Sequence, residues 1–140
     1  MNHQKIEARN KKLSDVFSSY EKNKLIPACD KYVDSKKGIA SGGISYTYAM
    51  ETLKETGMVR HLKVSTPHPF PEKLAVEFLT GLDEVLCLEE LDPVIERELI
   101  YICGKYHLNT KIIGKLSGDT ACAEKIHETA SLIISIHFLD

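Results

Sequence analysis

Apolar residues near the start of the chain recur at helical spacing. Five of them fall on one helical stripe: Ile6, Leu13, Val16, Phe17 and Tyr20. The opposite face is heavily charged and no Gly or Pro interrupts the stretch, so residues 1–23 are predicted to form an amphipathic lead-in helix. Such a helix must lie against another surface or remain marginal in water, which suggests that a neighbouring part of a longer protein is missing.

From residue 24 to residue 140 the pattern alternates between short β-type runs and helical spacing. The predicted strands are residues 25–29, 38–41, 61–65, 84–88 and 111–113. The predicted helices are residues 44–56, a stretch from Pro71 to Gly81, one from Pro93, and a last one from Thr120. Strands separated by helices cannot pair as tight hairpins, so the sheet should be parallel with right-handed crossovers. The predicted fold class is α/β, with three layers (α/β/α) and a mostly parallel sheet of about five strands.

Proline and glycine residues mark where these elements end. Pro27 cannot donate a ladder hydrogen bond, so the first strand should lie at a sheet edge and run antiparallel to its neighbour. Gly57 suits the end of the helix at 44–56. Asp92 is predicted to cap the helix that begins at Pro93, and Thr120 the final one.

Length and charge restrict the function classes. With 140 residues, 43% hydrophobic and 27% charged, the chain reads as one globular domain behind a lead-in helix. Eighteen Lys and Arg against 20 Asp and Glu leave no basic excess for binding nucleic acid. The longest apolar run is far below the roughly 20 residues that span a bilayer, and no signal-type stretch follows Met1. We therefore expect a cytoplasmic protein with no nucleic-acid or membrane partner.

The cysteine and histidine spacings predict no metal site. Four cysteines, namely Cys29, Cys87, Cys103 and Cys122, form no C-x-x-C pair for zinc or an iron–sulfur cluster. We expect them to be reduced residues of the core. No H-E-x-x-H pattern occurs either.

Candidate functional residues follow the predicted strands, because ligands and partners of a parallel sheet meet the loops at its carboxyl edge. Six positions stand out as possible interface residues: Ser41, Gly42, His68, Glu89, Glu90 and Asp92. The loop at 41–45 invites comparison with a phosphate-binding turn but lacks both the G-x-G-x-x-G and the P-loop spacing, which favours a tight turn without a ligand. No catalytic, cofactor-binding or metal-binding residue is assigned.

The histidine and the acids each have two interpretations. His68, between two prolines, could be presented rigidly as a general base, but no acid or nucleophile near it in sequence completes a set, so an exposed turn histidine is favoured. Glu89, Glu90 and Asp92 could act as paired carboxylates or dock a basic partner. A structural cap by Asp92 explains part of this cluster without either role.

Three motifs resemble the α subunit of indolepyruvate:ferredoxin oxidoreductases. They are G-I-A-S-G-G-I-S-Y at residues 38–46, P-F-P-E-K-L at 69–74 and D-E-V-L-C-L-E-E-L-D-P-V-I-E at 83–96. The chain departs from the family pattern at Gly43 and at residues 66–68 and 116–119. The resemblance spans the chain and implies the family's middle domain, which is similar to the transketolase C-terminal domain.

The resemblance also implies a role. Members of this family oxidatively decarboxylate aryl 2-oxoacids to acyl-coenzyme A, using thiamine diphosphate, Mg²⁺ and iron–sulfur clusters held on other domains. The middle domain is expected to be non-catalytic, to hold no cofactor, and to contact other domains or subunits through its carboxyl-edge loops and the lead-in helix. Ferredoxin and coenzyme A would be partners of the parent enzyme; whether two copies pair as a homodimer is left open. A free-standing small-anion or nucleotide-binding module and a protein-interaction domain are the alternatives.

Overall fold

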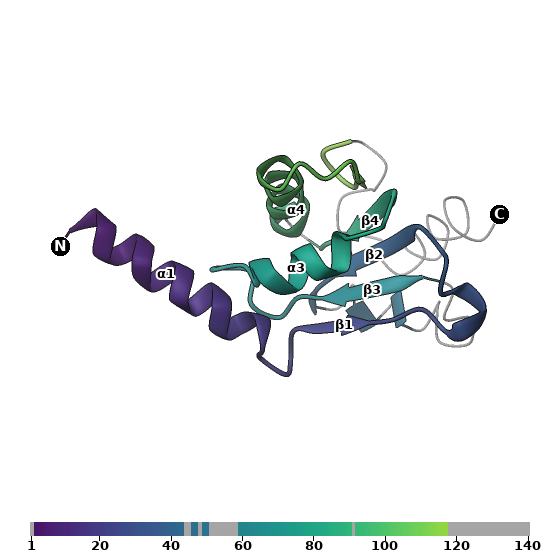
Figure 1. The fold of residues 1–140 in the computed structure, drawn as a ribbon, viewed down its shortest axis with the longest axis horizontal. Coiled ribbons are helices and arrows are strands. Elements are labelled where there is room, and N and C mark those ends of the chain that lie inside the picture. Colours follow the sequence, from purple (N-terminus) through teal and green to yellow (C-terminus); the bar gives the residue numbers. More distant parts are fainter. Residues whose placement is uncertain (1, 44–45, 48, 51–58, 91, 118–140) are drawn as a thin grey trace.

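The computed structural model describes residues 2–43, 46–47, 49–50, 59–90 and 92–117 (Figure 1). Its helices are α1 (His3–Ser18), α3 (Glu72–Leu79) and α4 (Val94–Lys105), with a short 3-10 turn at Asp30–Tyr32. Its strands are β1 (Lys24–Ile26), β2 (Lys37–Ser41), β3 (Arg60–Lys63), β4 (Glu84–Leu88) and β5 (Lys111–Ile113). All five predicted strands are therefore present, with small shifts at their ends.

The five strands form one sheet in the order β1-β3-β2-β4-β5. β2 pairs in parallel with both β3 and β4, and β4 pairs in parallel with β5. β1 is antiparallel to β3, with Leu25 opposite Leu62, and Pro27 follows directly after it. The prediction of a mostly parallel α/β sheet with one antiparallel edge strand is confirmed. Pro27 suits the edge position, because a residue without an N–H group is tolerated where no further strand must pair.

One face of the sheet packs against α3 and α4 (Figure 1). Alternate strand residues point to this face, since successive side chains of a strand lie on opposite sides. Its buried core is made of strand and helix residues that include Ala40, Leu62, Val85, Phe78, Leu79, Leu99 and Ile102.

The other face of the sheet is also buried. Ile39, His61, Leu86 and Ile113 on this face have almost no exposed surface. Burial on both faces is typical of a sheet in the middle of three layers. The helix predicted at residues 44–56 lies mostly outside the described residues, although residues 46, 47, 49 and 50 are helical; the one predicted from Thr120 lies wholly outside them.

Helix α1 extends away from the sheet as an arm (Figure 1). It is held to the body by polar contacts: the Ser14 hydroxyl donates to the carbonyl of Phe70, and the Ser18 hydroxyl accepts from the Leu74 amide at 3.3 Å. Asp15 adds an ion pair with Lys73 at 3.3 Å. The apolar stripe predicted for this helix does not form its main contact with the body, because three residues of the stripe are exposed: Leu13, Val16 and Tyr20.

Two of the four cysteines lie in the core, as predicted. Cys87 and Cys103 are buried, and burial raises the pKa of both thiols, which keeps them protonated. The prediction is wrong for Cys29, which is exposed because it lies in the turn after the edge strand. Cys122 falls outside the described residues. None of the helices that the structure describes has the length and hydropathy to cross a bilayer.

Candidate functional site

The candidate residues lie on or next to three loops, and the structure brings the loops after β2 and β4 together at the carboxyl edge of the sheet. Gly43, with φ of 61°, lies so close to Glu90 that a Cβ atom at this glycine would be 3.0 Å from Oε1 of the carboxylate. His68, from the third loop, is placed elsewhere and lines a groove beside α1. The predicted residues therefore divide between two places on the surface.

Glu89 is bound into the start of α4. Its Oε1 accepts a hydrogen bond from the Ile95 amide at 2.7 Å, and its Oε2 accepts one from the Glu96 amide at 3.1 Å. Burial raises the pKa of Glu89, while these two backbone hydrogen bonds act in the opposite direction. A carboxylate at this position satisfies amides that have no partner within the helix and complements the helix dipole.

The prediction that Asp92 caps this helix is wrong. Pro93 occupies the N-cap position and no side-chain cap bond is made from there. Glu89 caps the helix instead. Because β4 ends just before Glu89, the side chain of Glu89, which is longer than that of Asp92, lies next to the first amides of α4. The exposed Asp92 contributes only its carbonyl, which accepts from the Val94 amide at 2.8 Å.

We expect Glu89→Ala to destabilise the protein by about 1–2 kcal/mol, because two helix amides lose a charged acceptor. Glu89→Gln should lose less, since its amide oxygen can still accept one bond. Urea unfolding followed by circular dichroism measures both. Asp92→Ala is the matched control and should change stability by less than about 0.5 kcal/mol; a larger loss from Asp92→Ala than from Glu89→Ala would restore Asp92 as the cap.

Glu96 is a buried acid that sequence reasoning missed. Its two carboxylate oxygens accept from the Leu116 amide at 3.1 and 3.2 Å, and a Cβ atom at Gly114 would lie 2.6 Å from Oε1. The side chain therefore ties the loop after β5 to α4. One signal was available, because Glu96 precedes the buried Leu99 and Cys103 by three and seven positions, which places it on the buried face of the helix.

Ser41 is fully buried against His61 and does not reach the surface. Ser41 Oγ lies 2.6 Å from His61 Nε2, and the ring of Tyr46 lies 5.3 Å from the imidazole ring. This is the separation of a nucleophile and its base. However, only 2% of His61 is exposed, and burial lowers the pKa of its imidazole to about 4, so it is a weak base that substrate does not contact. The pair is best described as an internal hydrogen bond.

Gly42 has a packing role beside this pair. A Cβ atom there would lie 2.7 Å from the backbone carbonyl oxygen of Val64. The Val64 amide also donates to the Ser41 carbonyl at 2.9 Å. Glycine is thus required for close approach of the two chain segments, which accounts for the Gly42 position without a bound anion.

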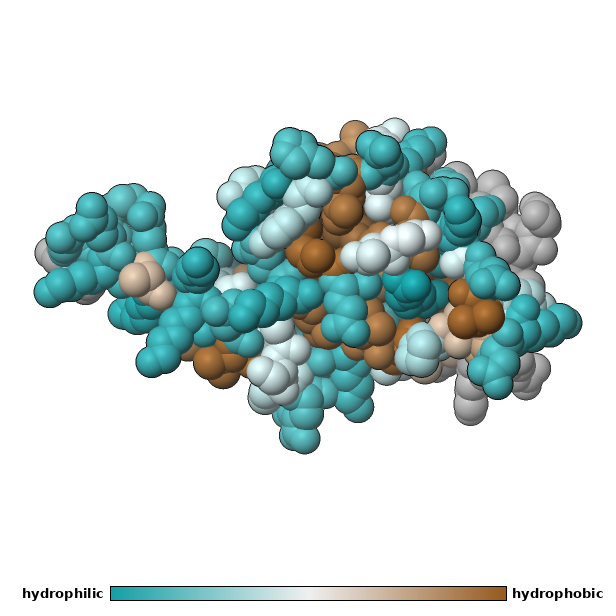
Figure 2. Space-filling view, in the orientation of Figure 1, coloured by the Kyte–Doolittle hydropathy of each residue, from teal (hydrophilic) through white to brown (hydrophobic). Residues whose placement is uncertain are grey.

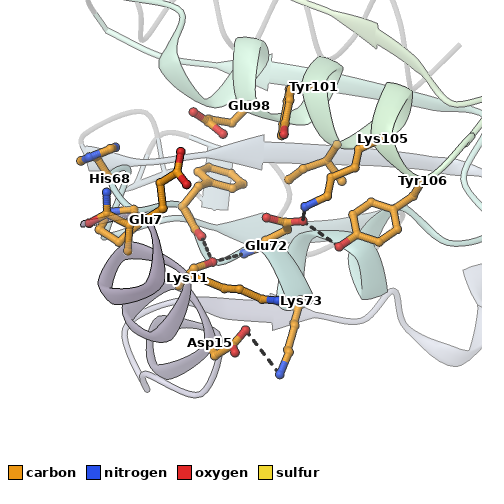
Figure 3. Close-up of a pocket in the computed structure, with 15 residues that line it drawn as sticks. Glu7, Lys11, Asp15, His68, Glu72, Lys73, Glu98, Tyr101, Lys105 and Tyr106 are labelled. Carbon is orange, nitrogen blue, oxygen red and sulfur yellow. Dashed lines mark hydrogen bonds and ion pairs between the residues drawn. The ribbon is translucent and has the colours of Figure 1, made fainter. Parts of the chain in front are cut away.

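A groove of about 1060 Å³ lies between α1, the segment at 68–70, α3 and α4 (Figure 3). In the space-filling view it is the hollow between the protruding arm and the body (Figure 2). On its floor the Glu72 carboxylate accepts from Lys105 Nζ and from the Tyr106 hydroxyl, each at 2.6 Å. Burial acts to raise the pKa of Glu72, but these two hydrogen bonds, together with the positive charges of Lys105 and Lys11, outweigh it and leave the pKa lowered.

The rest of the groove wall carries both charges and an aromatic ring. Lys11 comes from α1, Glu98 and the exposed Tyr101 come from α4, and His68 comes from the loop before α3 (Figure 3). Burial raises the pKa of Glu98, and the nearby His68 acts against this. Within the described residues, no group of three His, Cys, Asp or Glu side chains could hold a metal ion. The wall has the character of a polar contact surface.

Comparison with known proteins identifies relatives of the chain. It is 33% identical over 117 residues to indolepyruvate oxidoreductase subunit IorA of Methanothermobacter thermautotrophicus, an alignment that covers 83% of this chain and 18% of the relative. It is 40% identical over 84 residues to IorA of Pyrococcus horikoshii, covering 59% and 13%. For IorA of Archaeoglobus fulgidus the identity is 34% over 86 residues, covering 61% and 13%.

Other comparisons add no further family. No protein-family model matches the chain. No solved structure matches it either. The chain spans less than a fifth of the length of the curated relatives named above. The resemblance that the three motifs indicated is confirmed at the level of the subunit: this chain is a homologue of indolepyruvate oxidoreductase subunit IorA and corresponds to one part of it.

Proposed function

We propose that this chain is a non-catalytic structural and subunit-contact domain of a thiamine-diphosphate-dependent indolepyruvate:ferredoxin oxidoreductase. Residues 24–140 would be the transketolase C-terminal-like middle domain, and residues 1–23 its lead-in connector. The parent enzyme would decarboxylate aryl 2-oxoacids oxidatively to acyl-coenzyme A and pass electrons to ferredoxin. Homology to IorA supports the family, and the mostly parallel sheet with one antiparallel edge strand suits such a domain.

One observation carries the non-catalytic role: the polar groups at the carboxyl edge are used inside the domain. Glu89 caps α4, Glu96 holds the loop after β5, and Ser41 is bound to His61 beneath the surface. A structural role therefore accounts for each of these groups, and none of them requires a substrate as its partner. Thiamine diphosphate would supply the carbanion chemistry from other domains, and we assign no ligand of the diphosphate, Mg²⁺ or an iron–sulfur cluster to this chain.

The small-anion alternative receives no support from the loop geometry. The Glu90 carboxylate lies beside Gly43, where an anion would have to approach the backbone. Like charges at this separation repel each other. The alternative of an acidic docking loop is weakened as well, since Glu89 is occupied by the amides of α4.

Co-expression with the other oxidoreductase polypeptides of the same source tests the proposal. The chain should co-elute with them in size-exclusion chromatography, and the complex should reduce ferredoxin with indolepyruvate and coenzyme A. The chain alone should give neither ferredoxin reduction nor heat on titration with thiamine diphosphate and Mg²⁺. Turnover by the isolated chain, or failure to join the complex, would contradict the proposed function.

A further inference from the structure

Helix α1 carries a distinct outward face, opposite the groove. We define it by six residues: Lys5, Arg9, Lys12, Leu13, Val16, and Tyr20 just beyond the helix end. Their spacings of three, four and seven positions place them on one side of the helix. All six are exposed, and Val16 retains 55% of its surface.

The outward face is purely basic in its first half and apolar in its second. Lys5, Arg9 and Lys12 occupy the half nearest the N-terminus, and the apolar side chains follow. The two acids within His3–Ser18 are Glu7 and Asp15, and both line the groove on the opposite side. Within the described residues none of these three cations forms an ion pair, and together they are complementary to an acidic surface.

We propose that this outward face docks an acidic protein surface that carries an apolar strip beside its carboxylates, supplied by the remainder of the oxidoreductase. This inference rests on the proposed function, because a subunit-contact domain requires a partner surface, and the inference says what kind of surface that is. More than four-fifths of each curated relative named above lies outside the part that this chain matches, so ample protein surface is available there. Ser14 and Ser18 hold α1 to Phe70 and to Leu74 of α3 on its other side, which leaves the apolar residues of the outward face for this contact.

A second copy of the chain fits the outward face poorly. Two α1 helices packed in parallel would bring Lys5, Arg9 and Lys12 against their own counterparts, which is repulsive. Packed antiparallel, they would place the cations of one copy over the apolar half of the other, which removes charge from water without a partner. A reciprocal contact of each α1 with a different surface of the other copy would close as a two-fold dimer, so self-association is measured in the test below.

A membrane surface is also a poorer fit. Helices that lie in the membrane interface bury a continuous apolar face with basic residues along its polar side. Here the large apolar residue beside the outward face before Leu13 is Ile6, which is half-buried, so mainly the last two turns of the helix could enter the lipid. A protein partner with both an acidic and an apolar portion matches both halves.

The test measures binding of the chain to the co-expressed oxidoreductase polypeptides by surface plasmon resonance at about 0.15 M salt. The variant K5E/R9E/K12E should bind roughly tenfold to 100-fold more weakly than wild type. The affinity of the wild type, unlike that of the variant, should fall as the salt concentration is raised. Its matched control is K22E/K24E/K36E, which changes the same total charge on exposed side chains outside α1 and should bind within about twofold of wild type.

A second pair of variants tests the apolar half with a single change each. Val16→Asp should weaken binding roughly tenfold, because a carboxylate replaces an apolar contact and faces an acidic partner. Val33→Asp is the control, since Val33 is 66% exposed but lies after the 3-10 turn, away from α1. Circular dichroism and thermal melting confirm that each variant is folded.

The outcomes separate the inference from the proposed function. If the wild type does not bind the oxidoreductase polypeptides, both are wrong. If it binds but K5E/R9E/K12E and Val16→Asp bind equally well, only the docking surface is overturned. Self-association in analytical ultracentrifugation that these variants abolish would assign the face to a second copy. Binding to phosphatidylserine-containing vesicles that they abolish, with unchanged protein binding, would assign it to a membrane; either result overturns the inference.

Discussion

Phe78→Ala is expected to destabilise the domain by about 3–5 kcal/mol. Phe78 is fully buried on α3, and its ring lies over Gly38 of β2, where an added Cβ atom would be 3.0 Å from Cζ. The ring thus fills the space between helix and sheet that the glycine leaves. Its removal opens a cavity at the centre of the core, where α3 and the sheet cannot close together without disturbing the hydrogen bonds of Arg60 to the end of the helix.

Chemical unfolding by urea, followed by circular dichroism, measures this loss. A domain of this size has a total stability of about 5–15 kcal/mol, so the variant should unfold at a markedly lower denaturant concentration and melt roughly 10–20 °C earlier. Glu77→Ala, the neighbouring exposed position on the same helix, should stay within about 0.5 kcal/mol of wild type. Equal losses from both variants would show that Phe78 is not central to the core.

Much of the fold could be predicted because its determinants are local. Short strand runs of three to five residues, separated by stretches with helical spacing, leave little choice but a parallel sheet with crossovers. Pro27 also predicted which strand is the antiparallel edge strand, because a residue without an N–H group prevents a further strand from pairing there. Each of these conclusions depends on residues close together in sequence.

The roles of the acids could not be predicted, because they depend on which groups the fold brings together. Asp92 lies next to Pro93 in sequence and suits an N-cap, yet Glu89 reaches the amides of α4 because β4 ends beneath the helix. The spacing of Glu96 to Leu99 and Cys103 places it on the buried face of α4, but its partner, the Leu116 amide, comes from the loop after β5. A carboxylate's partner is set by tertiary geometry, which a spacing rule does not contain.

The contact between α1 and the body of the domain could not be predicted from the sequence either. Its apolar stripe predicted a packing face, but the helix is held by the Ser14 and Ser18 hydroxyls, which bind the Phe70 carbonyl just before α3 and the Leu74 amide within α3. A domain that belongs to a larger assembly presents apolar residues for surfaces that it does not itself contain. A pattern of hydrophobic positions indicates that a face is buried somewhere, without saying by which surface.

His61 is expected to make the stability of the protein strongly dependent on pH. In the folded chain, burial lowers the pKa of its imidazole to about 4, whereas the unfolded chain has the ordinary value of 6.5. Ser41 is bound at Nε2, and Nδ1 has no hydrogen-bond partner within the part of the chain that the structure describes. The arrangement therefore favours the neutral tautomer with hydrogen on Nε2, which leaves an unpaired acceptor at Nδ1 and no unpaired N–H group.

The sign of the effect follows from proton binding. Between pH 6.5 and about 4 the unfolded chain takes up a proton at His61 and the folded chain does not, so the stability present above pH 6.5 is lost as the pH falls. Each pKa unit corresponds to about 1.4 kcal/mol, which gives a loss of about 3 kcal/mol across this window. Urea unfolding at a series of pH values from about 7.5 to 4.5 measures most of it.

A His61→Gln variant isolates this contribution from that of the carboxylates, which titrate in both proteins. It keeps a polar side chain beside Ser41 without a titrating ring, so the difference in stability between wild type and variant should shrink by about 3 kcal/mol as the pH falls from 7 to 4. His3→Gln, at an exposed position on α1, should reproduce the wild-type profile. Parallel profiles for wild type and His61→Gln would mean that the folded protein admits the proton at His61, and hence that the face of the sheet carrying Ser41 and His61 opens to solvent.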